Sequence, residues 1–195
     1  KAAADIETVT PGKLTVATSP DFAPYEFYAI GEDGTPKLSG FDMDLAQYIA
    51  DYLGLELEVV TVDFDGVISE LQTKSVDLGM AGLSPDEKRM GIMDFSDLYY
   101  MGGQSLVTVK DNAEKYNSFE AINKPDVSVG AQVGSIQMDL ANENSPEADI
   151  VGLPKVTDII SELLTGKMDA AYIETDVAKS YQKNYPELTL VMDVP

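Results

Sequence analysis

The sequence predicts an α/β protein built from two lobes, each a mainly parallel sheet flanked by helices. Strand-like and helix-like segments alternate along most of its 195 residues, which is the pattern of right-handed βαβ units. A short internal repeat indicates that the two halves are built alike, because the tetrapeptide ISEL occurs at residues 68–71 and again at 160–163. Two further identities keep the same offset: Thr73 with Thr165, and Asp77 with Asp169. Two lobes with a cleft between them commonly form a ligand site.

Composition excludes several classes of function. The 13 lysines and arginines stand against 34 aspartates and glutamates, a net charge of −21 that argues against nucleic acid and anionic membranes as partners. There is no cysteine or histidine, which rules out disulfides, zinc thiolate sites and histidine-based triads. No apolar run approaches the roughly 20 residues of a membrane span. We therefore predict no catalytic residue, metal site or cofactor, and the acidity mildly favours a small cationic ligand.

The first lobe is predicted to occupy residues 13–103, after a flexible N-terminal tether at 1–12. Residues 14–16 form its first strand, and the loop at 19–25 carries two exposed-looking aromatic side chains, Phe22 and Tyr25. The remaining elements are a hairpin with strands at 26–29 and 37–39, a helix after Gly40, a strand at 55–62, a helix at 64–73 and a buried strand at 76–81.

The helix after Gly40 has an apolar stripe that we expect to face the core: Leu45, Tyr48, Ile49, Tyr52 and Leu53. Gly54 is predicted to end this helix as its C′ residue. Asp42 and Asp44 resemble a metal pair, but carboxylates in a first helical turn more often complement the helix dipole.

Residues 76–96 contain the most informative pattern in the chain. The strand at 76–81 breaks at Gly82, and a helix start follows in which Ser84 is the N-cap and Glu87 completes a capping box. Arg89, one turn in, is the only arginine in the chain. Exposed backbone N–H groups together with a planar, two-pronged cation make a good receptor for a carboxylate. The alternative is an ordinary turn with a solvated arginine.

A hinge strand is predicted at 104–110, followed by a second lobe at 111–187. Its elements are a short helix at 117–122, strands at 127–131, 150–151 and 170–173, and helices after 132–135, at 156–165 and at 175–185. A last strand at 188–192 lies in a segment, 188–195, that we expect to begin a return hinge strand in a chain that ends early.

The loops of the first lobe converge on one edge. In parallel sheets ligands bind at the carboxyl ends of the strands, where the loops 19–25, 63–66 and 82–89 would bring Phe22, Phe64, Ser84 and Arg89 together. Either phenylalanine alone would more often belong to the core. The presence of both at the same edge as Arg89 indicates a ligand pocket.

Several motifs together resemble the extracytoplasmic amino-acid-binding proteins of ABC importers, solute-binding protein family 3. The resemblance covers about residues 13–194 and rests on residues 14–27, 40–45, 63–64, 77–78, 84–89, 94–96, 130–135 and 169–174. It implies the two-lobed, periplasmic-binding-protein-like fold that closes over its ligand like a Venus flytrap, with hinge strands between the lobes.

The resemblance also implies roles for individual residues. Arg89 would grip the ligand α-carboxylate, and Ser84 and the Gly82 carbonyl would contact its α-carboxylate and α-ammonium. Phe22 and Phe64 would cover the ligand side chain. The second lobe would add the remaining groups: Ser135 and the Ile136 amide on the carboxylate, Glu174 on the ammonium. Ser19, Asp21, Tyr25 and Gln132 lie on loops that reach the ligand side chain.

The function implied is binding of a free polar L-amino acid and its delivery to an ABC transporter permease. Arginine or lysine is the best guess, and glutamine stays open. The protein would work in the periplasm or as a cell-surface lipoprotein, after removal of a signal peptide, with no membrane contact beyond a lipid anchor. Two alternatives remain: an enzyme like cyclohexadienyl dehydratase, and the extracellular sensor domain of a receptor.

Family members continue beyond the last strand found here. We therefore expect an exposed sheet edge and apolar face in the first lobe, with lower stability, weaker binding and a tendency to dimerise.

Overall fold

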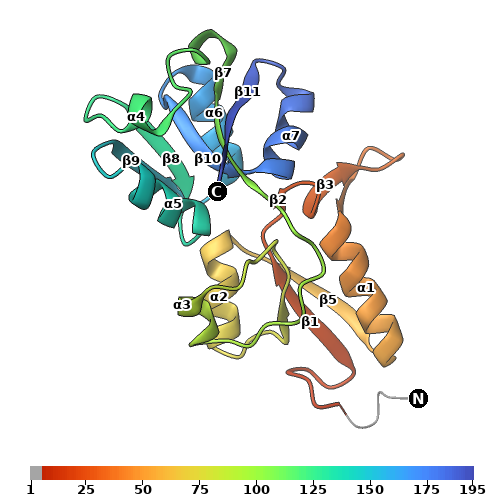
Figure 1. Cartoon of the computed structure of the whole chain (residues 1–195). Helices are drawn as coiled ribbons and strands as arrows, with labels where there is room; N and C mark the ends of the chain where they lie inside the picture. The colour runs from red at the N-terminus through yellow and green to blue at the C-terminus, as the bar shows by residue number, and fades with distance from the viewer. Residues whose placement is uncertain (1–5) are drawn as a thin grey trace. The chain divides into compact units, whose positions relative to one another are not determined.

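The computed structural model describes residues 6–195, which form two compact units, unit 1 up to Asp97 and unit 2 from Leu98 to Pro195 (Figure 1). The predicted class is confirmed, since each unit contains parallel strands flanked by helices. No helix among the described residues is both long and apolar enough to cross a membrane.

Unit 1 is built on a short parallel sheet. Its strands are β1 (Lys13–Thr18), β5 (Glu56–Thr61) and β6 (Leu78–Gly79), in the order β5-β1-β6. A separate antiparallel sheet joins β2 (Asp21–Phe22), β3 (Glu26–Ile30) and β4 (Pro36–Ser39), which confirms the predicted hairpin. The helices are α1 (Phe41–Leu53), α2 (Phe64–Gln72) and α3 (Glu87–Met90).

Two helices of unit 1 cover opposite faces of this sheet, and Figure 1 shows α1 on one side of β1 and β5 and α2 on the other. Beneath α1, the small side chains of Ala46 and Ala50 pack against Leu14 and Val16. Beneath α2, Phe64 and Val67 form a second cluster with Ala17 and its neighbours. The sheet is therefore a middle layer, whose strand ends carry the loops described below.

Unit 2 has a five-stranded mixed sheet in the order β11-β7-β10-β8-β9. The strands are β7 (Gln104–Val109), β8 (Ser128–Gln132), β9 (Asp149–Leu153), β10 (Ala170–Glu174) and β11 (Leu188–Val194). The helices are α4 (Phe119–Ile122), α5 (Ile136–Asn144), α6 (Val156–Thr165) and α7 (Thr175–Asn184), with a 3-10 turn, η2 (Lys110–Asn112).

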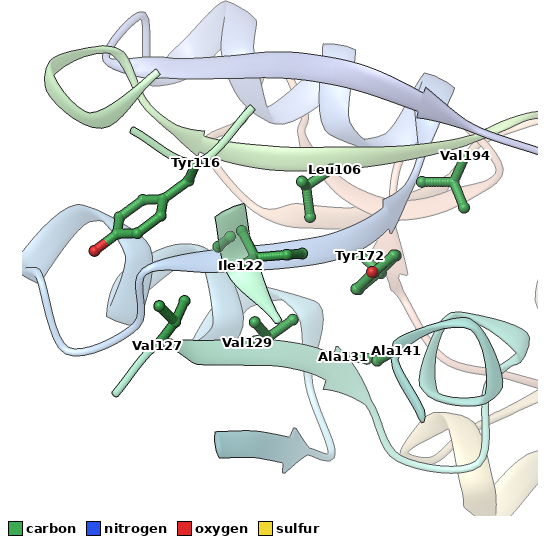
Figure 2. Packing of buried hydrophobic residues seen from close by; sticks show 10 residues of the cluster. Leu106, Tyr116, Ile122, Val127, Val129, Ala131, Ala141, Tyr172 and Val194 are labelled. Carbon is green, nitrogen blue, oxygen red and sulfur yellow. The ribbon is translucent and has the colours of Figure 1, made fainter. Parts of the chain in front are cut away.

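The core of unit 2 lies against this sheet. Figure 2 shows Leu106 of β7, Val129 of β8 and Tyr172 of β10 together with Ile122 of α4. On the edge strand, β11 pairs with β7 in antiparallel register inside unit 2, with a register shift between Leu190 and Met192. The segment 188–195, predicted to begin a return hinge strand, thus pairs with β7, the strand predicted as the hinge at 104–110, and both strands lie in the second sheet.

The repeated residues occupy matching places in the two units, which supports the prediction that the halves are built alike. The Asp77 carboxylate accepts the N–H of Thr15 at 2.8 Å, and the Asp77 N–H donates to the Thr15 carbonyl at 2.9 Å. Asp169 makes the same two contacts with Ser128, at 2.9 and 3.0 Å. Each aspartate therefore clamps the strand beside it. The paired threonines also bond alike, each hydroxyl donating to backbone carbonyls one turn earlier in α2 or α6.

The stripe predicted for α1 is wrong in part. Tyr48 and Tyr52 are 68% and 75% exposed, whereas Met43, Ala46 and Ala50 are buried. The physical reason is distance, because small alanines let the helix approach the sheet closely and large tyrosines would hold it away. The predicted C′ residue is confirmed, since Gly54 adopts the left-handed conformation with φ 70°.

Three further predictions in unit 1 need correction. The buried strand expected at 76–81 pairs only over Leu78–Gly79. The N-cap of α3 is Asp86 rather than Ser84, so Glu87 is the first helical residue and the capping box does not form. Phe22 and Tyr25, taken as exposed, are 4% and 6% exposed and stack on each other with ring centroids 5.7 Å apart.

Candidate ligand-binding site

Arg89 is a buried cation held in a fixed position. Its residue is 5% exposed, although it lies on the four-residue helix α3. The Arg89 backbone N–H donates to the Asp86 carboxylate at 2.7 Å, and Nη1 donates to the Ser84 carbonyl at 2.7 Å. The guanidinium carbon lies 5.6 Å from the centroid of the Phe64 ring. Such restraint suits a cation that binds an anion, because less side-chain freedom remains to be lost on binding.

Asp86 gives this cation both a helix cap and a counter-charge. One carboxylate oxygen accepts the N–H that would otherwise lack a partner at the start of α3. The other lies 3.7 Å from Arg89 Nε. Asp86 therefore sets the start of α3 and the orientation of Arg89 together.

Gly82 is the turn between β6 and the Arg89 segment, and its conformation requires glycine. Its φ is +60°, and a Cβ atom there would lie 2.8 Å from Cε2 of Phe22. The Gly82 N–H donates to the carboxylate of Asp42 at 3.0 Å, and Asp42 is fully buried. The first turn of α1 thus fixes the loop that carries Gly82 and Ser84.

Ser19 places a hydroxyl in the interior of unit 1. The residue is 2% exposed, and its Oγ has no hydrogen-bond partner within residues 6–195. A buried hydroxyl without a partner is costly, which makes it a candidate ligand contact. In unit 1, Arg89 therefore lies beside Phe64 and Ser84, and Phe22 packs against Gly82. Their joint use as a ligand site, with Ser19 on the loop after β1, stays a prediction.

Two helices of unit 2 begin at the same edge of its sheet. They are α5 and α7, which follow β8 and β10, and those strands are adjacent and parallel. Glu174 is the N-cap of α7, where its carboxylate accepts the N–H groups of Asp176 at 2.9 Å and Val177 at 3.4 Å. The residue is 6% exposed, so this buried negative charge sits among backbone donors.

The other three predicted residues of this unit lie between the end of β8 and the start of α5. Ser135 is its N-cap: the hydroxyl donates to the Gln132 carbonyl at 2.7 Å and accepts from the Met138 N–H at 3.2 Å. Ile136 is the first helical residue, so its N–H lies among the groups that a helix leaves without an intrahelical partner. Gln132 is buried, and its amide donates to the Pro154 carbonyl at 3.1 Å.

Sequence reasoning missed several residues that hold the predicted site residues in place. In unit 1 these are Asp42, which binds the Gly82 N–H, and Asp86, which binds Arg89. In unit 2, the Gln137 amide donates to the Gln104 side chain at 2.6 Å, and the hydroxyls of Ser105 and Thr175 lie 2.8 Å apart. Only Asp86 left a signal, because aspartate two positions after serine is an equally good N-cap. The described residues contain no group of three or more acidic side chains able to hold a metal ion.

The chain belongs to the bacterial extracellular solute-binding proteins, family 3, whose model matches residues 14–189. It is 35% identical over 178 residues to the arginine-binding extracellular protein ArtP of Bacillus subtilis, covering 90% of this chain and 66% of that protein. It is also 28% identical to the cyclohexadienyl dehydratase of Pseudomonas aeruginosa, over 92% of this chain and 66% of the enzyme. The chain thus spans about two thirds of the length of these relatives.

Solved structures give the same result for the fold. The amino acid ABC transporter substrate-binding protein AbpA of Streptococcus pneumoniae, bound to L-arginine, matches with a TM-score of 0.88 and 37% identity. The match covers 92% of this chain and 75% of that structure. It confirms the predicted two-lobed, periplasmic-binding-protein-like fold.

Proposed function

We propose that this chain binds a free L-amino acid outside the cytoplasm and delivers it to the permease of an ABC transporter. The observation that carries the proposal is Arg89, a buried guanidinium fixed by Ser84, Asp86 and Phe64 at the strand ends of unit 1. A buried cation of this kind is a receptor for the α-carboxylate that all amino acids share. Membership of an extracellular binding-protein family supports the location.

The same proposal gives the other residues their roles. Ser84 and the Gly82 carbonyl contact the ligand backbone, while Phe22 and Phe64 cover its side chain. Ser135 and the Ile136 N–H add donors for the carboxylate, and Glu174 receives the ammonium. The Ser135 hydroxyl proton already goes to Gln132, so this serine must rotate its hydroxyl to donate to a ligand. Residues 13–103 and 111–187 act as lobes that close through the strand at 104–110.

We propose arginine as the preferred ligand, with lysine and then glutamine as weaker ones. Two similar proteins are named for arginine binding or were solved with L-arginine bound. A cationic ligand also suits a chain whose net charge is −21. Ser19, Asp21, Tyr25 and Gln132 are the residues proposed to meet the guanidinium end.

An enzyme is the second candidate, because one relative is a cyclohexadienyl dehydratase. Such an enzyme needs a general acid or base, and the chain has no histidine to act as one. Glu174 would have to serve, yet its carboxylate already caps α7 through two backbone N–H groups. We therefore propose a binding protein without catalysis. Turnover of prephenate or arogenate by the purified chain would overturn that choice.

Titration calorimetry tests the proposal with a small ligand panel. We expect arginine to bind and agmatine, which is arginine without its carboxylate, to bind far more weakly. Arg89→Ala should cost about 2–5 kcal/mol of binding free energy, and Arg89→Lys should also bind poorly because a point charge cannot make two parallel hydrogen bonds. Lys88→Ala is the matched control, since it removes an exposed positive charge from the same helix. Normal arginine binding by Arg89→Ala would show that the site is wrong.

A further inference from the structure

The outward side of α1 carries three exposed aromatic side chains in one line. Phe41, Tyr48 and Tyr52 are 48%, 68% and 75% exposed. At 3.6 residues per turn, these positions fall within a narrow strip of the helix surface, opposite the buried Ala46 and Ala50. We call Phe41, Tyr48 and Tyr52 the α1 aromatic stripe.

Among residues 6–195, neither the hydrophobic core nor the proposed amino-acid site includes Phe41, Tyr48 or Tyr52. Single exposed apolar residues are normal on a soluble protein, but several large ones in a row indicate a contact surface. Tyrosine is a common anchor of protein interfaces, because it buries much area while few rotatable bonds are fixed. The stripe therefore has the composition of a docking surface.

The charges beside the stripe limit what can bind there. Asp44 and Asp51 are exposed along one edge, and the Gln47 amide donates to Asp51 at 2.9 Å. The helix has no lysine or arginine along its length. An anionic bilayer would be repelled by this edge, and two copies packed through α1 would bring aspartates together. The complementary surface is an apolar groove rimmed by lysine or arginine.

We propose that the α1 aromatic stripe docks on a protein with such a groove. The assignment of that protein rests on the proposed function, which makes it the extracytoplasmic face of the transporter permease. The helix also touches the amino-acid site, because Asp42 in its first turn holds the Gly82 N–H at 3.0 Å. The two sides of α1 thus serve two tasks: the inner side fixes the ligand loop, and the outer side binds the transporter.

The test measures how the protein stimulates ATP hydrolysis by the reconstituted transporter at saturating arginine. The variant is Tyr48→Gln with Tyr52→Gln, because glutamine is polar and favours helices. We expect the protein concentration for half-maximal stimulation to rise about tenfold or more, as for the loss of interface anchors. The matched control is Tyr185→Gln, which changes a tyrosine that is 42% exposed in unit 2. That control should stimulate like the parent chain.

A second variant tests the acidic edge. Asp44→Lys with Asp51→Lys should also raise the half-maximal concentration, and the increase should shrink as salt is added. Unchanged stimulation by the tyrosine variant, with normal arginine binding, overturns the docking site and leaves the proposed function intact. No arginine binding by the parent chain overturns both.

Two control measurements address other occupants of the stripe. A dimer of the parent chain in analytical ultracentrifugation that disappears in the tyrosine variant would assign the stripe to a second copy and overturn the proposal. Co-sedimentation with phosphatidylglycerol vesicles that depends on the two tyrosines would overturn it in favour of a membrane.

Discussion

Glu174 is the residue in which a structural and a ligand-binding role meet. Its carboxylate caps α7, and we propose that it also receives the ligand ammonium. Glu174→Gln keeps a side-chain oxygen for the cap but removes the charge. We expect this variant to bind arginine much more weakly than the parent chain does, while the deaminated analogue, 5-guanidinopentanoate, loses little affinity. Calorimetry on both ligands measures the difference. Equal weakening of the two would contradict an ammonium contact.

Residues whose partners are close in sequence were the predictable ones. Arg89 stood out as the single arginine, following a strand end and a helix start. Its cap was mistaken because Ser84 and Asp86 are both good N-cap residues, and sequence does not tell which backbone N–H each one meets. The hydrogen bond from Gly82 to Asp42 could not be predicted from the sequence, because only the fold brings together these residues, which are 40 positions apart.

Hydrophobic periodicity in the sequence predicted the helices correctly where their buried side chains are large. Helix α6 has the predicted bounds, Val156–Thr165, and buries Val156, Ile159, Ile160 and Leu163. Helix α1 was misjudged because its buried side is formed largely by alanines, which a hydrophobic stripe does not reveal. Strand β6 was overestimated because the mostly apolar run at 76–81, interrupted by Asp77, predicts a buried segment more reliably than it predicts ladder pairing.

Asp169 and Asp77 are predicted to stabilise the strand that each one contacts. Asp169→Ala would leave the Ser128 N–H without its acceptor at the start of β8. We expect the free energy of unfolding of unit 2 to fall by about 1–3 kcal/mol, the usual cost of leaving a buried donor unpaired. Asp77→Ala should act likewise on unit 1, where two N–H groups, those of Val9 and Thr15, lose their acceptor.

Urea unfolding followed by circular dichroism measures both losses. Asp126→Ala, at an exposed position in unit 2, controls for the removal of one negative charge from an acidic chain. If Asp169→Ala and Asp126→Ala unfold at the same urea concentration, the aspartate clamp does not stabilise its sheet.

At the scale of the whole molecule, the repeat predicted two similarly built halves, and the structure has two compact units with matching aspartate clamps. The pairing of β11 with β7 could not be read from sequence, because a single strand carries no signal for its neighbour. Strand partners are chosen by the packing of the complete sheet, which in unit 2 brings residues from both ends of the unit together.

The chain should lose stability in alkali through Tyr172. Burial raises the pKa of this tyrosine above its ordinary value of 10.0, and the hydrogen bond with Ser145, 2.7 Å between hydroxyl oxygens, offsets part of that rise. A tyrosine is neutral when protonated. Between the unfolded and the folded pKa, the unfolded state therefore releases a proton that the folded state keeps. The contribution of Tyr172 to the free energy of unfolding is therefore fully present below pH 10.0, and it is lost as the pH rises through the pKa of the folded state.

The slope of that loss approaches about 1.4 kcal/mol per pH unit for a single group. Denaturant unfolding at pH 8 to 11 would measure it. Tyr172→Phe lowers stability at every pH, because Ser145 loses its partner, but it should flatten the alkaline slope since no proton remains to be released. The exposed Tyr185→Phe should leave the slope unchanged. The slope decides the matter: if Tyr172→Phe and the parent chain lose stability in parallel, the alkaline transition comes from other groups, and burial of this tyrosine does not control it.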